Sequence, residues 1–121
     1  KRREKDNQSQ VMNVIGDVAE KTCVLVDDIV DTAGTICNAA EALKNAGAKK
    51  VISYATHPVL SGPALKRIEK SGLDEIIVTD TIPLSEEASK LNKIKIISLE
   101  KTIAEAINRV NKEESVSAMF L

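Results

Sequence analysis

The feature of this sequence that most restricts its fold is an unbroken apolar run at residues 22–26 (TCVLV), which acidic residues follow directly. Unbroken apolar runs of this kind are typical of strands that are buried on both faces of a parallel sheet. Three further strand candidates follow at 51–56, 75–79 and 94–99. The sequence therefore predicts a parallel sheet that is covered by helices.

Segments with helical periodicity separate these strand candidates. Gly47 stands where a left-handed C-terminal cap would end the first helix. Ser-Gly-Pro at 61–63 is typical of the start of a second helix, and Gly72 of its end. Strands that alternate with helices at this spacing form βαβ units, so the predicted fold class is α/β. The apolar positions of the three helices are Ile36, Ala39, Ala40 and Leu43, then Leu65 and Ile68, then Ile103, Ile107 and Val110.

The size and charge of the chain exclude several classes of protein. Its 121 residues correspond to one domain, because domains usually contain about 100–150 residues. With 17 basic and 18 acidic residues the formal charge is −1, and aromatic residues make up only 2%. No apolar run approaches the roughly 18 residues of a membrane span. We therefore expect no membrane partner and no nucleic acid partner.

The two cysteines and the single histidine do not suggest a metal site. Cys23 and Cys37 form no C-x-x-C unit, and His57 cannot complete a four-ligand zinc site with them. We interpret both cysteines as small buried thiols of a reducing compartment, the cytoplasm, rather than as a disulfide. His57 follows a predicted strand, where a structural role is favoured over contact with a ligand.

Residues 27–35 (DDIVDTAGT) carry the most specific chemistry, because ligands of open α/β sheets bind beyond the carboxyl ends of the strands. The backbone N–H groups and hydroxyls of residues 32–35 suit a phosphate monoester at a helix N-terminus, and Gly34 permits its close approach. The first two carboxylates would repel a phosphate but accept hydrogen bonds from a sugar diol. The candidate binding residues are Asp27, Asp28, Asp31, Thr32, Ala33, Gly34 and Thr35.

An alternative remains open for these aspartates. They could form only a solvated turn and an N-cap cluster that favours the helix dipole. Neither a P-loop motif nor a dinucleotide-binding G-x-G-x-x-G motif occurs in the chain.

Several motifs in one order along the chain resemble a known family. VLVDDIVDTAGT at 24–35 looks like the phosphoribosyl-diphosphate motif of type I phosphoribosyltransferase folds. Together with the other motifs it resembles the ribose-phosphate pyrophosphokinases, or phosphoribosyl-diphosphate synthetases, and most of all their bacterial, phosphate-regulated class. The resemblance covers essentially the whole chain. The other motifs are KRR at 1–3, NVIGDV at 13–18, ATHPVLSGPA at 55–64, TDTIPL at 79–84 and ESVSAMF at 114–120.

The resemblance implies the C-terminal half of a tandem two-domain enzyme. Residues 1–20 would be a flexible catalytic arm, and residues 21–121 a type I phosphoribosyltransferase-like domain. The family transfers the diphosphoryl group of Mg-ATP to the 1-hydroxyl of ribose 5-phosphate and releases AMP. Lys1 and Arg3 would be catalytic, because they would neutralise charge in the transition state. From the residues alone, positions 1–10 would instead be a mobile polar terminus.

The resemblance also implies what the chain does not supply. ATP and most ligands of Mg²⁺ would belong to an N-terminal domain outside this sequence, so we expect the fragment alone to be inactive. Ser115, Ser117 and Phe120 would help bind the effectors phosphate and ADP between subunits of a homohexamer. Without the resemblance, the alternating residues of this tail predict an edge strand that packs Phe120.

Two other functions stay open at this point. The chain could be a non-catalytic, sugar-phosphate-binding regulatory relative, or a type I phosphoribosyltransferase. Lys1 and Arg3 favour the enzyme over the first alternative, because a binding module does not need charges that act on a transition state. The second alternative would explain the acidic segment but not KRR or ESVSAMF.

Overall fold

Four parallel strands form one sheet whose spatial order, β1-β2-β3-β4, follows the order of the chain. The structure is a computed structural model that describes residues 13–121, so the predicted catalytic residues Lys1 and Arg3 lie outside the described residues. The predicted parallel α/β class is confirmed. The elements are β1 (Thr22–Val30), α1 (Gly34–Asn45), β2 (Lys50–Pro58), α2 (Ala64–Lys70), β3 (Glu75–Thr79), α3 (Glu86–Ser89), β4 (Ile94–Ile97), α4 (Glu100–Asn111) and the 3-10 helix η1 (Ser117–Phe120).

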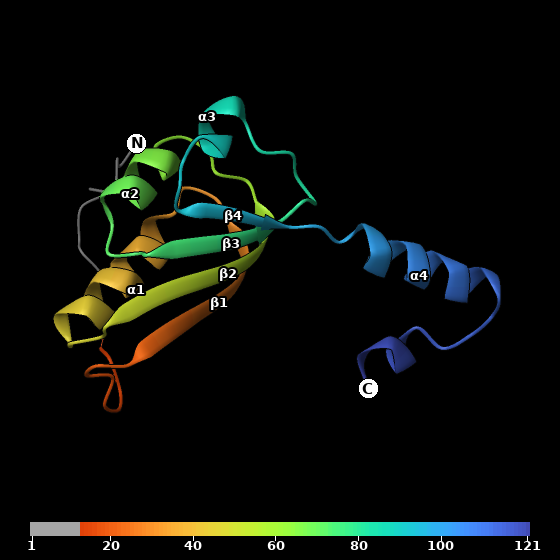
Figure 1. Ribbon diagram of the computed structural model, residues 1–121, viewed down its shortest axis with the longest axis horizontal. Helices are drawn as coiled ribbons and strands as arrows, with labels where there is room; N and C mark the ends of the chain where they lie inside the picture. The colour runs from red at the N-terminus through yellow and green to blue at the C-terminus, as the bar shows by residue number, and fades with distance from the viewer. Residues whose placement is uncertain (1–12) are drawn as a thin grey trace, which may run out of the picture.

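Helices α1 and α2 pack on one face of the sheet and form the core with it (Figure 1). Ala40 of α1 and Ile68 of α2 are fully buried together with Val51 and Ile76 of the sheet. Helix α1 ends as expected, because Gly47 has a φ of 96° and donates its N–H to the preceding turn at 3.0 Å. Two right-handed crossovers between neighbouring parallel strands place both helices on the same side of the sheet.

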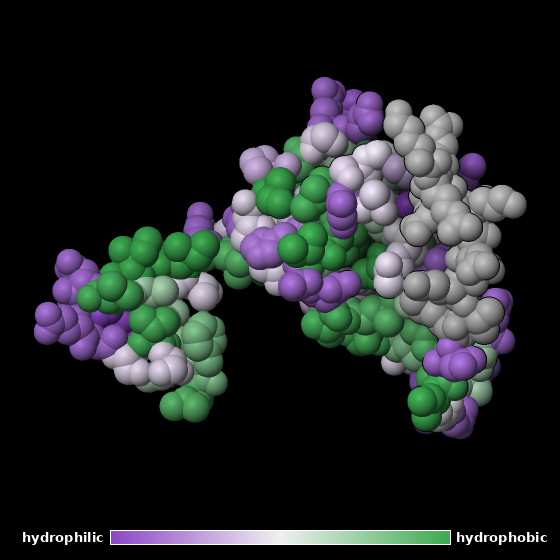
Figure 2. Space-filling view, turned by 180° about the vertical axis from the view of Figure 1, so that it is seen from behind, coloured by the Kyte–Doolittle hydropathy of each residue, from purple (hydrophilic) through white to green (hydrophobic). Residues whose placement is uncertain are grey.

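The opposite face of the sheet is open, so the prediction that the strand at 22–26 is buried on both faces is wrong. Val24 is 53% exposed and Val26 is 80% exposed, and Tyr54 and Ile96 on neighbouring strands are exposed as well. The physical reason is that α1 and α2 leave this face uncovered. Figure 2 shows hydrophobic residues at the surface of the sheet domain and of the projecting C-terminal segment.

Helix α4 was predicted correctly, but it projects away from the sheet (Figure 1). Its apolar residues Ile103, Ile107 and Val110 are between 49% and 67% exposed. The amphipathic stripe therefore has no covering element within residues 13–121. None of the helices in this part of the chain is both long and apolar enough to cross a membrane.

The predicted edge strand at the C-terminus is also wrong, because the tail forms η1 and Phe120 is 73% exposed. Short-range bonds explain the difference. Arg109 Nη1 donates to the Ser115 carbonyl at 3.0 Å, and Met119 N–H donates to the Val116 carbonyl at 3.0 Å. These bonds coil the tail beside α4, far from any strand edge.

The remaining differences from the predictions concern boundaries and one short helix. Strand β1 continues through the acidic residues to Val30, and β2 continues to Pro58, so His57 lies inside a strand. Helix α3 was not predicted; the Ser85 hydroxyl caps it by accepting the Ala88 N–H at 3.1 Å.

Both cysteines are free, as expected. Cys37 is buried, whereas Cys23 is only partly buried. Burial raises the pKa of the Cys37 thiol, so this side chain stays protonated and belongs to the core.

Candidate functional site

A cavity of about 200 Å³ lies where β1 ends and α1 begins. Ala33 joins the turn to the helix in the left-handed conformation, with φ 61° and ψ 11°. Of the residues predicted to bind ribose 5-phosphate, all line this cavity except Asp28, which belongs to β1 and does not line it. The lining residues are Asp27, Ile29, Val30, Asp31, Thr32, Ala33, Gly34, Thr35 and Ile36.

The N-terminus of α1 forms one end of this cavity. The first helical bond runs from the Cys37 N–H to the Ala33 carbonyl at 3.1 Å. The N–H groups of residues 34–36 precede this bond and have no acceptor within the helix. Ala33 makes no side-chain cap bond, and the first turn of α1 holds no acidic residue. Within the described residues, this end is therefore open to an anion.

The segment that follows β2 holds the turn from the other side. The carbonyl groups of three successive residues, 30–32, accept hydrogen bonds from it. The donors are the N–H of Leu60, the N–H of Ser61 and Nη1 of Arg67, each at 3.0 Å. A trans peptide points its C=O and N–H in opposite directions, so these bonds direct the N–H groups of residues 31–33 away from that segment.

Asp27 stands at the other end of the cavity, toward β1, and Asp31 stands in the turn between the two ends. Asp27 Oδ1 accepts the Asp28 N–H at 2.8 Å, and the Asp31 carboxylate accepts the Ser61 hydroxyl. Asp27 also borders a larger hollow of about 270 Å³ on the open sheet face, next to Val26 and Tyr54. The site therefore has an acidic end and an end rich in N–H groups, only a few residues apart.

Two contributors to this arrangement, Ser61 and Arg67, were not predicted from the sequence as parts of the site. Ser61 was assigned only to a helix start, and Arg67 was not singled out. Their partners in the turn lie 30 and 35 positions earlier in the chain. A local pattern carries no signal for such bonds, because they depend on how β2 and α2 pack beside β1.

His57 lines neither cavity. Its Nδ1 lies 2.9 Å from the Thr81 hydroxyl, which itself donates to the Thr56 carbonyl at 3.1 Å. His57 thus ties the end of β2 to the segment after β3, which agrees with a structural role.

The predicted effector residues lie together only in part. The hydroxyls of Ser115 and Ser117 are 3.1 Å apart, whereas Phe120 is exposed at the end of η1. This tail is far from the start of α1 in Figure 1.

The described residues contain carboxylates at the cavity but no cluster of metal-ligating side chains. Among residues 13–121, no three His, Cys, Asp or Glu side chains gather into a group that could hold a metal ion. Mg²⁺ usually takes one or two carboxylates together with waters and substrate phosphates. Asp27 and Asp31 at the cavity could supply only part of such a set.

The fold and the cavity define a class first: this is an α/β domain with a four-stranded parallel sheet and a cavity at the carboxyl end of β1, where ligands of such sheets bind. The chain belongs to the family of the phosphoribosyl synthetase-associated domain, which matches residues 3–121. The resemblance inferred from the sequence motifs is thereby confirmed.

Proteins named ribose-phosphate pyrophosphokinase are similar to this chain. The one from Coxiella burnetii is 64% identical over 121 residues, which are 100% of this chain and 38% of that protein. The one from Haemophilus influenzae is 56% identical over 120 residues, or 99% of this chain and 38% of that protein. The crystal structure of phosphoribosylpyrophosphate synthetase from Mycobacterium smegmatis matches with a TM-score of 0.77 and 42% identity, over 82% of this chain and 33% of that one.

The chain thus spans about 38% of the length of these curated relatives. It corresponds to their C-terminal domain region.

Proposed function

We propose that this chain is the ribose 5-phosphate-binding part of a ribose-phosphate pyrophosphokinase. The observation that carries this proposal is the cavity at residues 27–36, which has the Asp27 carboxylate at one end and, at the other, the N–H groups of residues 34–36 that have no acceptor within α1. The phosphate of the sugar binds at residues 31–35, which we call the phosphate loop. The sugar diol binds at Asp27, with Asp28 beside it on β1.

The phosphate loop binds its ligand mainly through backbone groups. The N–H groups of Gly34, Thr35 and Ile36 precede the first helical bond, and the helix dipole adds positive potential there. The hydroxyls of Thr32 and Thr35 can add hydrogen bonds to phosphate oxygens. Such fixed donors orient the sugar, so that its 1-hydroxyl lies at a defined place for the transfer.

A catalytic arm completes the proposal. Residues 1–20 form this arm, and its Lys1 and Arg3, which lie outside the described residues, stabilise charge on the transferring diphosphoryl group. ATP and Mg²⁺ bind mostly through residues outside this sequence, and residues 21–121 form the sugar-phosphate domain. From the family relationship we also propose that the protein is located in the cytoplasm and assembles as a homohexamer. Phosphate and ADP would bind as effectors at Ser115, Ser117 and Phe120.

Isothermal titration of ribose 5-phosphate into the chain tests the binding step. We expect saturable binding that Gly34→Val abolishes, because the added side chain would fill space beside the loop; a Cβ at Gly34 already lies 3.3 Å from Arg67 Nη1. Asn38→Val is the matched control, since Asn38 is exposed on the same helix and does not line the cavity. Equal binding by both variants would contradict the proposed site.

A chimera tests the reaction. The matching segment of the Coxiella burnetii protein would be replaced by this chain, which is 64% identical to it. We expect the chimera to release AMP from ATP in the presence of Mg²⁺ and ribose 5-phosphate, and the chain alone to stay at background. A folded chimera that binds ribose 5-phosphate but does not release AMP would favour a regulatory, non-catalytic relative.

A further inference from the structure

The structure assigns a positioning role to Arg67: from α2 it holds the Thr32 carbonyl and thereby keeps the phosphate loop in its binding conformation. This inference rests on the proposed function and adds a residue to its site. Arg67 is exposed and lies 35 positions from Thr32, yet its Nη1 donates to that carbonyl at 3.0 Å. The guanidinium therefore donates a hydrogen bond to the loop backbone instead of forming a surface ion pair with another described residue.

The phosphate loop needs such support because its conformation is unfavourable by itself. Ala33 has a φ of 61°, in the left-handed region that a residue with a Cβ seldom adopts. Leu60, whose N–H bonds the Val30 carbonyl, has a φ of 51° and is also left-handed. Backbone conformations of this kind persist where surrounding contacts determine them, and they cluster at ligand sites.

Gly34 shows how closely the guanidinium packs against the loop. A Cβ placed on this glycine would lie 3.3 Å from Arg67 Nη1 and 3.9 Å from Arg67 Cζ. Gly34 has no positive φ, so the turn itself does not require a glycine here. The missing side chain instead leaves room for the guanidinium to pack against the turn at Gly34.

The positive charge of Arg67 is available to attract an anion at the phosphate loop. Within residues 13–121, the ion pairs involve other side chains, and Arg67 takes part in none of them. A guanidinium carries five N–H donors, so the bond to Thr32 leaves several free. The positive charge thus stands next to the loop that receives the phosphate dianion and favours the anion there.

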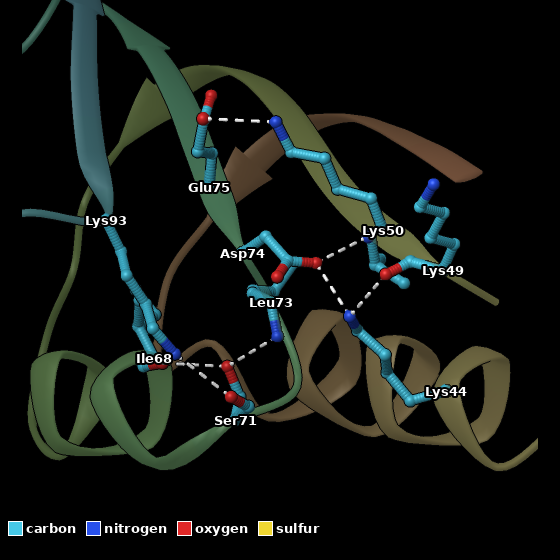
Figure 3. A network of polar contacts seen from close by, with 10 residues as sticks. Lys44, Lys49, Lys50, Ile68, Ser71, Leu73, Asp74, Glu75 and Lys93 are labelled. Atoms are coloured by element: carbon cyan, nitrogen blue, oxygen red, sulfur yellow. Dashed lines mark hydrogen bonds and ion pairs between the residues drawn. The ribbon is translucent and has the colours of Figure 1, made fainter. Parts of the chain in front are cut away.

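Helix α2, which carries Arg67, is held firmly at both of its ends. The next residue, Ile68, is fully buried in the core, as is Ala64 at the start of α2. Lys93 Nζ donates to the carbonyl groups of Ile68, Glu69 and Ser71 at 3.0 to 3.1 Å, so it caps the end of α2 (Figure 3). A short helix that is anchored at both ends can hold a side chain at a fixed distance from the loop.

Three variants test this role: Arg67→Ala, Arg67→Lys and, as the matched control, Lys66→Ala on the exposed side of the same helix. Isothermal titration with ribose 5-phosphate should show about tenfold weaker binding for Arg67→Ala, the size of a lost charge-assisted hydrogen bond. Arg67→Lys keeps the charge and a donor, so it should bind within about threefold of the unchanged chain. Lys66→Ala should bind as the unchanged chain does.

Three further measurements distinguish a loss of folding from a loss of loop positioning. Because Arg67 is exposed, we expect Arg67→Ala to keep a cooperative thermal unfolding transition, with a midpoint only slightly below that of the unchanged chain. In the free chain, the backbone amide resonances of Ala33 and Gly34 should shift in Arg67→Ala but not in Lys66→Ala. In the chimera, the KM for ribose 5-phosphate should rise in Arg67→Ala while kcat changes little.

A failure of the proposed function and a failure of the positioning role of Arg67 give different results. If the unchanged chain does not bind ribose 5-phosphate, the proposed function fails. If it binds, and Arg67→Ala binds equally well, the positioning role is overturned. Unshifted amide resonances at residues 33 and 34 in Arg67→Ala, or an Arg67→Lys variant as weak as Arg67→Ala, would overturn it as well.

Discussion

Asp74, just before β3, ties three elements of the fold together, and its replacement by Ala should destabilise the chain by about 2 kcal/mol. Its Oδ2 accepts the N–H of Val51 at 2.7 Å and lies 2.9 Å from Lys44 Nζ (Figure 3). Val51 is fully buried, and leaving its N–H without an acceptor costs about 1–3 kcal/mol. The ion pair adds less, about 0.2–1 kcal/mol, because the two side chains are 30% and 38% exposed.

Two variants separate these contributions. Asp74→Asn keeps an oxygen that can accept the Val51 N–H, so it should lose only the charge and cost about 1 kcal/mol or less. Glu75→Gln is the control, because the Glu75 carboxylate lies 3.3 Å from Lys50 Nζ and accepts no backbone N–H of residues 13–121. Urea unfolding followed by circular dichroism measures all three free energies. An Asp74→Ala variant that is as stable as Glu75→Gln would show that the bond from the Val51 N–H to Asp74 does not stabilise the fold.

The same contribution should depend on pH. The hydrogen bond from Lys44, with the N–H of Val51 next, lowers the pKa of Asp74 from its ordinary value of 3.8. A carboxyl whose pKa is lower in the folded state stabilises the fold fully above its unfolded pKa. This stabilisation is lost as the pH falls through the folded pKa. The difference between the unchanged chain and Asp74→Asn should therefore be constant near neutral pH and shrink below about pH 4. A difference that stays constant down to pH 2 would contradict this cause.

Three further predictions concern other parts of the chain. Lys93→Met keeps the aliphatic stem but removes the cap of α2, so urea unfolding should show a loss of about 1–2 kcal/mol; an unchanged free energy would contradict the cap. Asp31→Ala should weaken ribose 5-phosphate binding in isothermal titration, because the Ser61 hydroxyl loses its acceptor and the turn loses a contact; unchanged affinity would remove Asp31 from the site. In the chimera, Lys1→Ala and Arg3→Ala should lower kcat far more than they raise the KM for ribose 5-phosphate, and a rise in KM alone would make the arm a binding device.

The sequence predicted which segments form strands and helices better than it predicted which side chains these elements bury. Strand β3 has the predicted bounds, Glu75–Thr79, and the parallel class follows from strands that alternate with helices. The run at 22–26 shows the limit, because its hydrophobicity does not tell which face of the sheet is covered. Val26 is apolar and yet 80% exposed. A local pattern reports what a strand could bury, and the described residues supply helices for one face only.

In the candidate site, likewise, the contiguous turn was predicted from the sequence, whereas the contact from a distant segment was not. The turn at residues 31–35 is contiguous in the chain, and its residue types were sufficient to single it out. Arg67 was missed because an arginine on a short amphipathic helix has the pattern of an ordinary surface residue. Its bond to Thr32 exists only once β2 has placed α2 beside the turn. The C-terminal tail was misassigned for a related reason: its alternating residues fit a strand, but no strand edge lies beside it.

Nuclear magnetic resonance of the chain during titration with ribose 5-phosphate tests the central claim most directly, because it locates the ligand as well as detecting it. The account predicts saturable shifts that are largest at the backbone amides of residues 32–36, with a second, smaller group around Asp27. Inorganic phosphate should shift only the first group. Shifts that centre on the open sheet face around Tyr54, or no saturable shifts at residues 32–36, would contradict the claim that the turn after β1 binds the sugar phosphate.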